Sequence, residues 1–135
     1  VQIGLQSTTH NAAHKRSFDA GKLVEVMSRM NAAGAGTSID VIMGLPGETA
    51  QDFMNTVEYA ISLNPMYLVV NTLFINPGTE LAKTASDYGI KARRMNFNVP
   101  YIVESNTFKE QDLDQCRAWL QTKVAENRHI TFTLR

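Results

Sequence analysis

Cysteine is nearly absent from this chain, since Cys116 is the only one among 135 residues. One thiol cannot form an internal disulfide, and it cannot supply a metal site that needs several cysteines. Long apolar runs are also missing. None reaches the roughly 18 residues that a membrane span requires, and the N-terminus lacks the basic-then-apolar pattern of a signal peptide. These absences favour a cytoplasmic protein.

An excess of charge of either sign is missing as well. Thirteen basic residues balance thirteen acidic ones, so the formal net charge is zero. Proteins that bind nucleic acid or a membrane surface usually carry a basic excess or a basic amphipathic face. The composition therefore predicts neither a nucleic-acid partner nor a membrane partner. A chain of this length suits one domain around a single core.

Three apolar or alternating segments that stop at turn-forming residues are predicted strands: residues 1–7, 38–44 and 67–76. A helical pattern comes after each of them. The first, interrupted near residues 19–21, stops at Gly34; the second covers residues 49–63 with Thr49 as its cap; the third is short and closes at Gly89. Three successive strand–helix units predict parallel strands and an α/β fold, and the separation between strand starts suits a barrel segment or a doubly wound sheet.

The remainder of the chain has a different pattern. Residues 91–108 are predicted to be a connecting loop, with a short strand at residues 101–103 as an alternative. An amphipathic helix is expected over residues 110–127, and residues 130–134 are expected to form a closing strand. We therefore divide the chain into the strand–helix units, residues 1–90, and a loop, helix and strand, residues 91–135, that pack on them.

Ligands of parallel α/β folds bind at the carboxyl ends of the strands, and this rule selects Gln6, Gly44, Pro46 and Asn76. Strand alternation places Gln6 with Gln2 and Gly4, and it places Asp40 with Ile42 and Gly44. Asp40 is then an acid in an apolar strand, where it needs a hydroxyl, an amine or an arginine as partner. Asn71 and Asn76 have opposite parities, so only one of them is expected to contact a ligand.

The motifs in order resemble the latter half of the radical S-adenosylmethionine (SAM) superfamily. They lie at residues 3–7, 16–19, 39–49 and 77–81. Residues 100–113 are similar to the segment after the barrel in cobalamin-binding members. The resemblance implies that residues 1–90 are the C-terminal half of a TIM-like barrel. It also implies a parent Fe–S oxidoreductase that uses SAM and a 4Fe–4S cluster, and it adds cobalamin as a candidate cofactor.

For individual residues, the resemblance implies that Gln6 and Asp40 lie near SAM and that Arg16 approaches the SAM carboxylate. The cluster-binding motif CxxxCxxC would precede the first residue, since the chain starts at what resembles the fourth barrel strand. We therefore assign no metal ligand and no catalytic residue, and we expect the isolated chain to be inactive. Its expected partners are the missing N-terminal half-barrel, a small or macromolecular substrate of unknown identity, and other copies of itself.

A different class of function remains open: a stand-alone, non-catalytic α/β module that binds a phosphate or nucleotide at the turn of residues 44–49. His10 and His14 have helical metal-binding spacing but no third ligand, so a solvated face is the preferred interpretation. Cys116 falls on the apolar stripe of its helix and is expected to be inert. The enzyme hypothesis depends on Gln6 and Asp40 extending from neighbouring parallel strands into one cavity.

Overall fold

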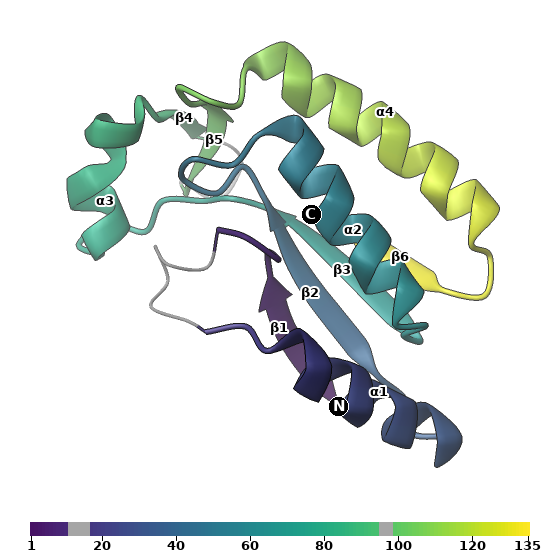
Figure 1. Cartoon of the computed structure of the whole chain (residues 1–135). Helices are drawn as coiled ribbons and strands as arrows, with labels where there is room; N and C mark the ends of the chain where they lie inside the picture. The colour runs from purple at the N-terminus through teal and green to yellow at the C-terminus, as the bar shows by residue number, and fades with distance from the viewer. Residues whose placement is uncertain (11–16, 95–98) are drawn as a thin grey trace.

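A four-stranded parallel sheet is the centre of the fold in the computed structural model, which describes residues 1–10, 17–94 and 99–135. The strands lie in the order β1 (Gln2–Gln6), β2 (Ser38–Met43), β3 (Tyr67–Thr72) and β6 (Thr131–Leu134), as Figure 1 shows. Every pair of neighbours is parallel. This confirms the predicted α/β class, and an open parallel sheet with alternating helices is the arrangement of a partial barrel.

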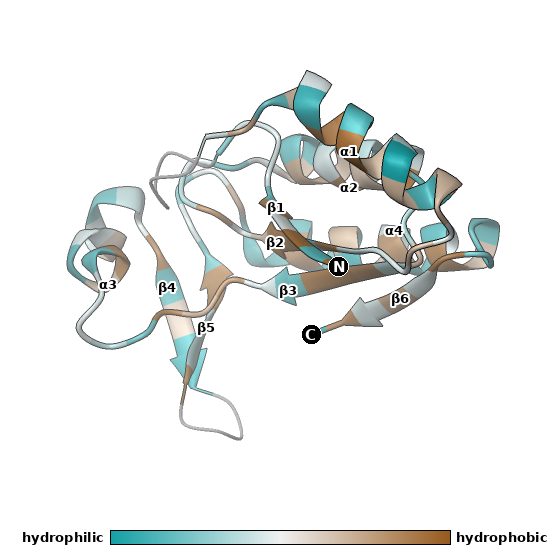
Figure 2. Ribbon diagram, turned by 90° about the horizontal axis from the view of Figure 1, so that it is seen from below, coloured by the Kyte–Doolittle hydropathy of each residue, from teal (hydrophilic) through white to brown (hydrophobic). Residues whose placement is uncertain are grey.

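Three helices cover one face of this sheet. They are α1 (Ala20–Ala32), α2 (Ala50–Ser62) and α4 (Glu110–Glu126). Figure 2 shows α1 and α2 on the same side of the strands, and α4 contributes to the core on that side. No helix in the described part of the chain covers the middle of the opposite face. The short helix α3 (Glu80–Thr84) and a 3-10 turn, Ala85–Tyr88, lie beyond the carboxyl ends of the strands.

Side-chain caps fix where the helices begin. The Thr49 hydroxyl accepts a hydrogen bond from the Asp52 amide at 3.2 Å, and the Asp52 carboxylate accepts one from the Thr49 amide at 3.0 Å. This reciprocal pair is the predicted capping arrangement at the start of α2. Asp19 caps α1 in a similar way, and Gly89 ends the 3-10 turn with a φ of 61°. The interruption expected near residues 19–21 is therefore the beginning of α1.

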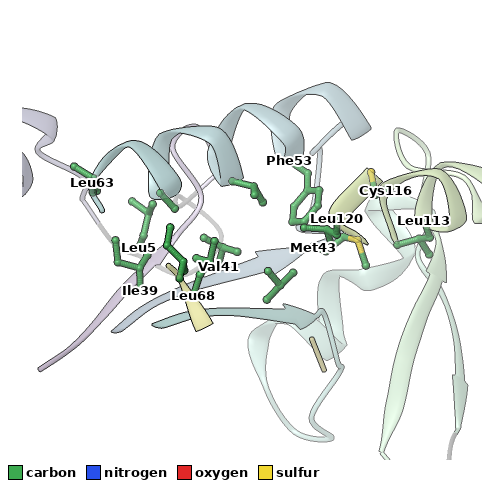
Figure 3. Close-up of a cluster of buried hydrophobic side chains, with 14 of the residues drawn as sticks. Leu5, Ile39, Val41, Met43, Phe53, Leu63, Leu68, Leu113, Cys116 and Leu120 are labelled. Atoms are coloured by element: carbon green, nitrogen blue, oxygen red, sulfur yellow. The ribbon is translucent and has the colours of Figure 1, made fainter. Parts of the chain in front are cut away.

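The main core lies between the sheet and its helices, as Figure 3 shows. Ile39, Val41 and Met43 alternate along β2 and are at most 2% exposed. Phe53 of α2 and Leu120 of α4 pack on them and are also almost fully buried. The alternation of β2 therefore sets which face of the sheet the helices cover. No helix among residues 1–10, 17–94 and 99–135 is long and apolar enough to cross a membrane.

A second, antiparallel sheet occupies part of the segment predicted to be a loop. It consists of β4 (Lys91–Arg94) and β5 (Pro100–Glu104). The loop prediction for residues 91–108 is corrected here, and only the alternative strand near residue 101 was anticipated. The strand predicted over residues 67–76 also ends earlier, at Thr72, because Phe74 bridges to Tyr101 of β5. Pairing with this hairpin turns the chain away from the main sheet.

Candidate functional site

Asp40 lies on the sheet face that the three large helices leave uncovered. Its Oδ2 atom accepts a hydrogen bond from Nε2 of Gln2 at 2.5 Å, and Ser38 Oγ lies 3.4 Å from Oδ1. Asp40 is half-buried, so these contacts compensate part of the cost of removing a carboxylate from water. The partner that Asp40 was expected to need is thus the side-chain amide of Gln2, on the neighbouring strand β1. The remaining carboxylate lone pairs can accept a further donor.

Gln6 stands at an irregularity of β1. Gly4 pairs with Asp40, but Gln6 pairs with Val41, so the register shifts between them. Gln6 has a φ of 66°, a left-handed conformation that is rare for a residue with a side chain. The simple alternation that grouped Gln6 with Gln2 and Gly4 therefore stops at this bulge. The parallel pairing of the two strands holds, whereas the hydrogen bond to Asp40 across it comes from Gln2.

A small pocket lies at the carboxyl end of β3. Its volume is about 210 Å³, and both Asn71 and Asn76 line it. The expectation that only one of these two residues could face a common site was wrong. The chain leaves the sheet after Thr72 and pairs with β5, so strand parity no longer relates the two residues. The other walls are largely apolar: Ile42, Leu73, Phe74 and Leu81.

Gly44 and Pro46 belong to a buried turn. Gly44 has a φ of 91°, and a Cβ atom there would lie 3.0 Å from Cγ2 of Ile102. Only glycine fits this position without strain, since the conformation and the close approach of β5 both exclude a side chain. The Thr107 hydroxyl donates to the Glu48 carbonyl oxygen at 2.7 Å, which ties the turn to the segment after β5. The turn is a packed structural element rather than an open loop.

The Glu48 carboxyl group is enclosed by this turn and has no solvent exposure. Its Oε2 atom accepts hydrogen bonds from the amides of Gly44 at 2.8 Å and Leu45 at 3.2 Å, while Oε1 has no partner. Burial raises the pKa of Glu48 from 4.5 to about 8; the two amides oppose the rise and the charge of Asp52 adds to it. The group is therefore protonated at neutral pH.

A side-chain contact links the segment after β1 to the start of α2. Nε2 of His10 lies 3.0 Å from Oδ2 of Asp52, the carboxylate that also caps α2. Burial alone would raise the pKa of Asp52, but the hydrogen bonds from Thr49 and His10 outweigh it and lower the pKa. The solvated face predicted for His10 is thus replaced by a half-buried hydrogen bond to Asp52. His14 and Arg16 lie outside the described residues.

Metal-ligating groups do not converge in the described structure. No group of three or more histidine, cysteine, aspartate or glutamate side chains there is arranged to hold a metal ion. Cys116 is fully buried, and burial, Glu48 and Asp112 together raise its pKa to about 12. Such a thiol is protonated and inaccessible, so the structure provides no nucleophile at this position.

The fold and site thus define an α/β protein with a polar open sheet face and a pocket at its carboxyl edge. No family model matches the chain. Its relatives include three enzymes named tRNA-2-methylthio-N(6)-dimethylallyladenosine synthase. The one from Psychrobacter arcticus is 29% identical over 133 residues, or 96% of this chain and 26% of that enzyme.

The other two similarities are shorter. The synthase of Leifsonia xyli subsp. xyli is 33% identical over 73 residues, which is 53% of this chain and 14% of the enzyme. That of Bifidobacterium longum is 40% identical over 48 residues, which is 34% of the chain and 10% of the enzyme. The chain therefore corresponds to about a quarter or less of these relatives by length, and it resembles part of an enzyme.

Proposed function

We propose that this chain is the C-terminal part of the barrel of a radical SAM enzyme and that it contributes to the binding of SAM and substrate there. The observation that carries the proposal is the one-sided cover of the sheet. Three helices bury one face, and the other presents Gln2, Asp40 and Asn71 beside a pocket at the carboxyl edge. A barrel interior that holds a polar ligand needs a face of this kind.

Two features of the sequence support this assignment. The four sequence motifs resemble the radical SAM superfamily in their order, and the similar proteins are enzymes that modify a nucleoside in tRNA. Neither the motifs of this chain nor the relatives' names identify its own reaction. We therefore propose radical SAM chemistry for the parent enzyme, without a subtype and without cobalamin.

The residues that would hold SAM are best sought around the pocket. Its 210 Å³ lie below the roughly 300 Å³ at which ligand pockets usually begin, so it suits one ring rather than a whole cofactor. Asn71 and Asn76 offer amide donors and acceptors, and Asp40 can accept a hydrogen bond farther down the same face. Gly44 and Pro46 would not contact SAM themselves, but they shape the turn at the end of β2.

An iron–sulfur cluster does not fit the described residues, because they contain one cysteine and no convergent set of ligands. We propose that the ligands come from an upstream half-barrel, which would also cover the open sheet face. Without it, the exposed edge of β1 and the open face would favour association between copies of the chain. A cytoplasmic location is proposed on the composition alone.

The rival function, phosphate binding at the turn of residues 44–49, has less support. An anion at such a turn would use backbone amides, but the amides of Gly44 and Leu45 already donate to Glu48 Oε2. These two amides are therefore not available to a phosphate.

The coding sequence upstream of Val1 is the first test. We expect an in-frame CxxxCxxC motif about three strands earlier, and a start codon immediately before Val1 would contradict the proposal.

The second test uses the longer protein, reconstituted without oxygen and assayed for 5′-deoxyadenosine. The substitution Asn71→Ala removes one polar contact, which contributes about 1–3 kcal/mol. It should therefore weaken SAM binding by roughly tenfold. Asn55→Ala, an exposed asparagine on α2, is the matched control. Equal effects of the two substitutions would show that Asn71 is not part of the site.

A further inference from the structure

Two aromatic rings and one guanidinium group form a row across the antiparallel sheet. Phe74 bridges to Tyr101, and Tyr101 pairs with Arg93 of β4. Directly paired residues on neighbouring strands point to the same face, so the three side chains lie next to one another. The ring centroids of Phe74 and Tyr101 are 6.0 Å apart with an interplanar angle of 61°. We call Phe74, Tyr101 and Arg93 the aromatic row.

Two side chains of the aromatic row, Phe74 and Arg93, are exposed, and Tyr101 between them is half-buried. Phe74 is 43% exposed and the Arg93 side chain is 69% exposed, whereas Ile102, which points the opposite way, is 2% exposed. Adjacent exposed rings form an apolar surface that a ligand can cover. The row therefore needs an explanation other than core packing.

A groove on one side of the aromatic row and a pocket on the other could hold a ligand. Arg93 and Tyr101 line a groove of about 670 Å³ whose other walls come from α4 and from strands β2, β3, β5 and β6. Phe74 lines the smaller pocket that contains Asn71 and Asn76. The row thus joins an open groove to the pocket at the carboxyl edge of the main sheet, where the proposed function places SAM and substrate.

Cationic side chains lie beside the row, although the whole chain is neutral. All four residues of β4 are exposed, and strand alternation places Lys91 on the same face as Arg93 and Arg94 on the opposite face. Lys91 pairs with Glu104, and Arg93 lies 3.8 Å from Glu110. Exposed ion pairs contribute only about 0–1 kcal/mol, so phosphate groups can compete for these cations. A balanced total charge therefore does not exclude a local anionic partner.

From this arrangement we infer that the aromatic row binds unpaired bases of an RNA substrate. Single-stranded RNA is recognised by stacking of splayed bases on aromatic rings and arginine planes, with cations along the phosphates. Rings, guanidinium and adjacent cations are all present, and the neighbouring pocket has the size of one ring. The inference rests on the proposed function and names its substrate class, in agreement with the tRNA nucleoside in the relatives' names.

The experiment measures binding of a fluorescein-labelled, single-stranded 12-nucleotide RNA to the chain by fluorescence anisotropy at low salt, without SAM. Stacking contributes about 1–3 kcal/mol per base, so Phe74→Ala should raise the Kd by tenfold or more. Tyr67→Ala removes a ring that is 45% exposed at the other end of β3, and it should change the Kd less than twofold.

A salt titration tests whether Arg93, the cation of the row, contacts a phosphate of the RNA. Each phosphate contact contributes about 0.7 to the slope of log K against log salt for single strands, so Arg93→Gln should lower the slope by that amount. Arg29→Gln is the matched control, because Arg29 is also exposed and paired with a glutamate, at 3.6 Å. It should leave the slope unchanged.

Three results would overturn the inference: no binding of the RNA by the unaltered chain, equal effects of Phe74→Ala and Tyr67→Ala, or equally tight binding of a duplex of the same length. Sedimentation of the same samples tests the alternative that the aromatic row contacts another copy of the chain. If Phe74→Ala abolishes self-association and leaves RNA binding unchanged, the row is a contact between copies. Because no SAM or cluster is used, a negative result here leaves the upstream-motif test of the proposed function intact.

Discussion

Replacing Glu48 by glutamine should remove most of the pH dependence of stability between pH 5 and pH 8. The folded chain holds this carboxyl at a pKa of about 8, against 4.5 for the ordinary group. Above pH 4.5 the unfolded chain releases the proton while the folded chain keeps it. The unfolded state is therefore stabilised relative to the folded state as the pH rises. Stability is therefore highest at low pH and falls as the pH rises through 8.

The magnitude follows from the difference between the two pKa values. Each unit corresponds to about 1.36 kcal/mol, and integration from pH 5 to pH 8 gives a loss of about 3 kcal/mol from this one group. Glutamine keeps an oxygen that accepts from the amides of Gly44 and Leu45, and it cannot ionise. The amide NH2 takes the place of Oε1, which has no partner, so its cost shifts the stability of the variant equally at every pH. The stability of the variant relative to the parent should therefore be about 3 kcal/mol higher at pH 8 than at pH 5.

Urea unfolding followed by the fluorescence of Trp119 measures this difference at each pH. Other groups also titrate in this range, but they titrate in both proteins and cancel when the two free energies of unfolding are subtracted. Glu25→Gln, an exposed glutamate on α1, controls for the loss of a charge and should leave the pH dependence unchanged. Parallel curves for the parent and Glu48→Gln would refute the reasoning, because they would show that Glu48 ionises alike in the folded and unfolded states.

Three further predictions concern the buried turn and its surroundings. Gly44→Ala should cost more than Gly34→Ala in urea unfolding, by about 1 kcal/mol or more, because both glycines have positive φ but only Gly44 approaches Ile102; equal costs would show that the contact is unimportant. Thr49→Ala should lower the free energy of unfolding by about 1 kcal/mol through loss of the α2 cap, and an unchanged thermal midpoint would contradict this. The Cys116 thiol, with its pKa raised to about 12, should react with a thiol reagent at pH 8 only after denaturant is added, and fast reaction of the native chain would show that it is not buried.

Local patterns in the sequence were sufficient for much of the fold. Alternating apolar residues in β2 specify which face is buried, and Thr49 with Asp52 specifies where α2 starts. The same reasoning failed for β4, because Lys-Ala-Arg-Arg has no apolar alternation and is exposed throughout. Its strand conformation comes from pairing with β5, which is a tertiary interaction and leaves no periodic signal in the segment itself.

The candidate site was only partly predictable for the same reason. Asp40 was recognisable as an acid within an apolar strand, but its partner Gln2 is 38 residues away in sequence. Asn71 and Asn76 were judged by strand parity, which holds only while the chain stays in the strand. The aromatic row was missed entirely, because Phe74 and Tyr101 become neighbours only through the bridge between their segments.

The sequence alone determined the order of the parallel strands and the long helices, the α/β class and the buried face, since these depend on periodicity and capping over a few neighbouring residues. Tertiary structure decided the bulge at Gln6, the enclosure of Glu48 and the hairpin beyond β3. Each of these depends on contacts between segments far apart in the chain, and their energies come from desolvation and close packing that no local pattern encodes.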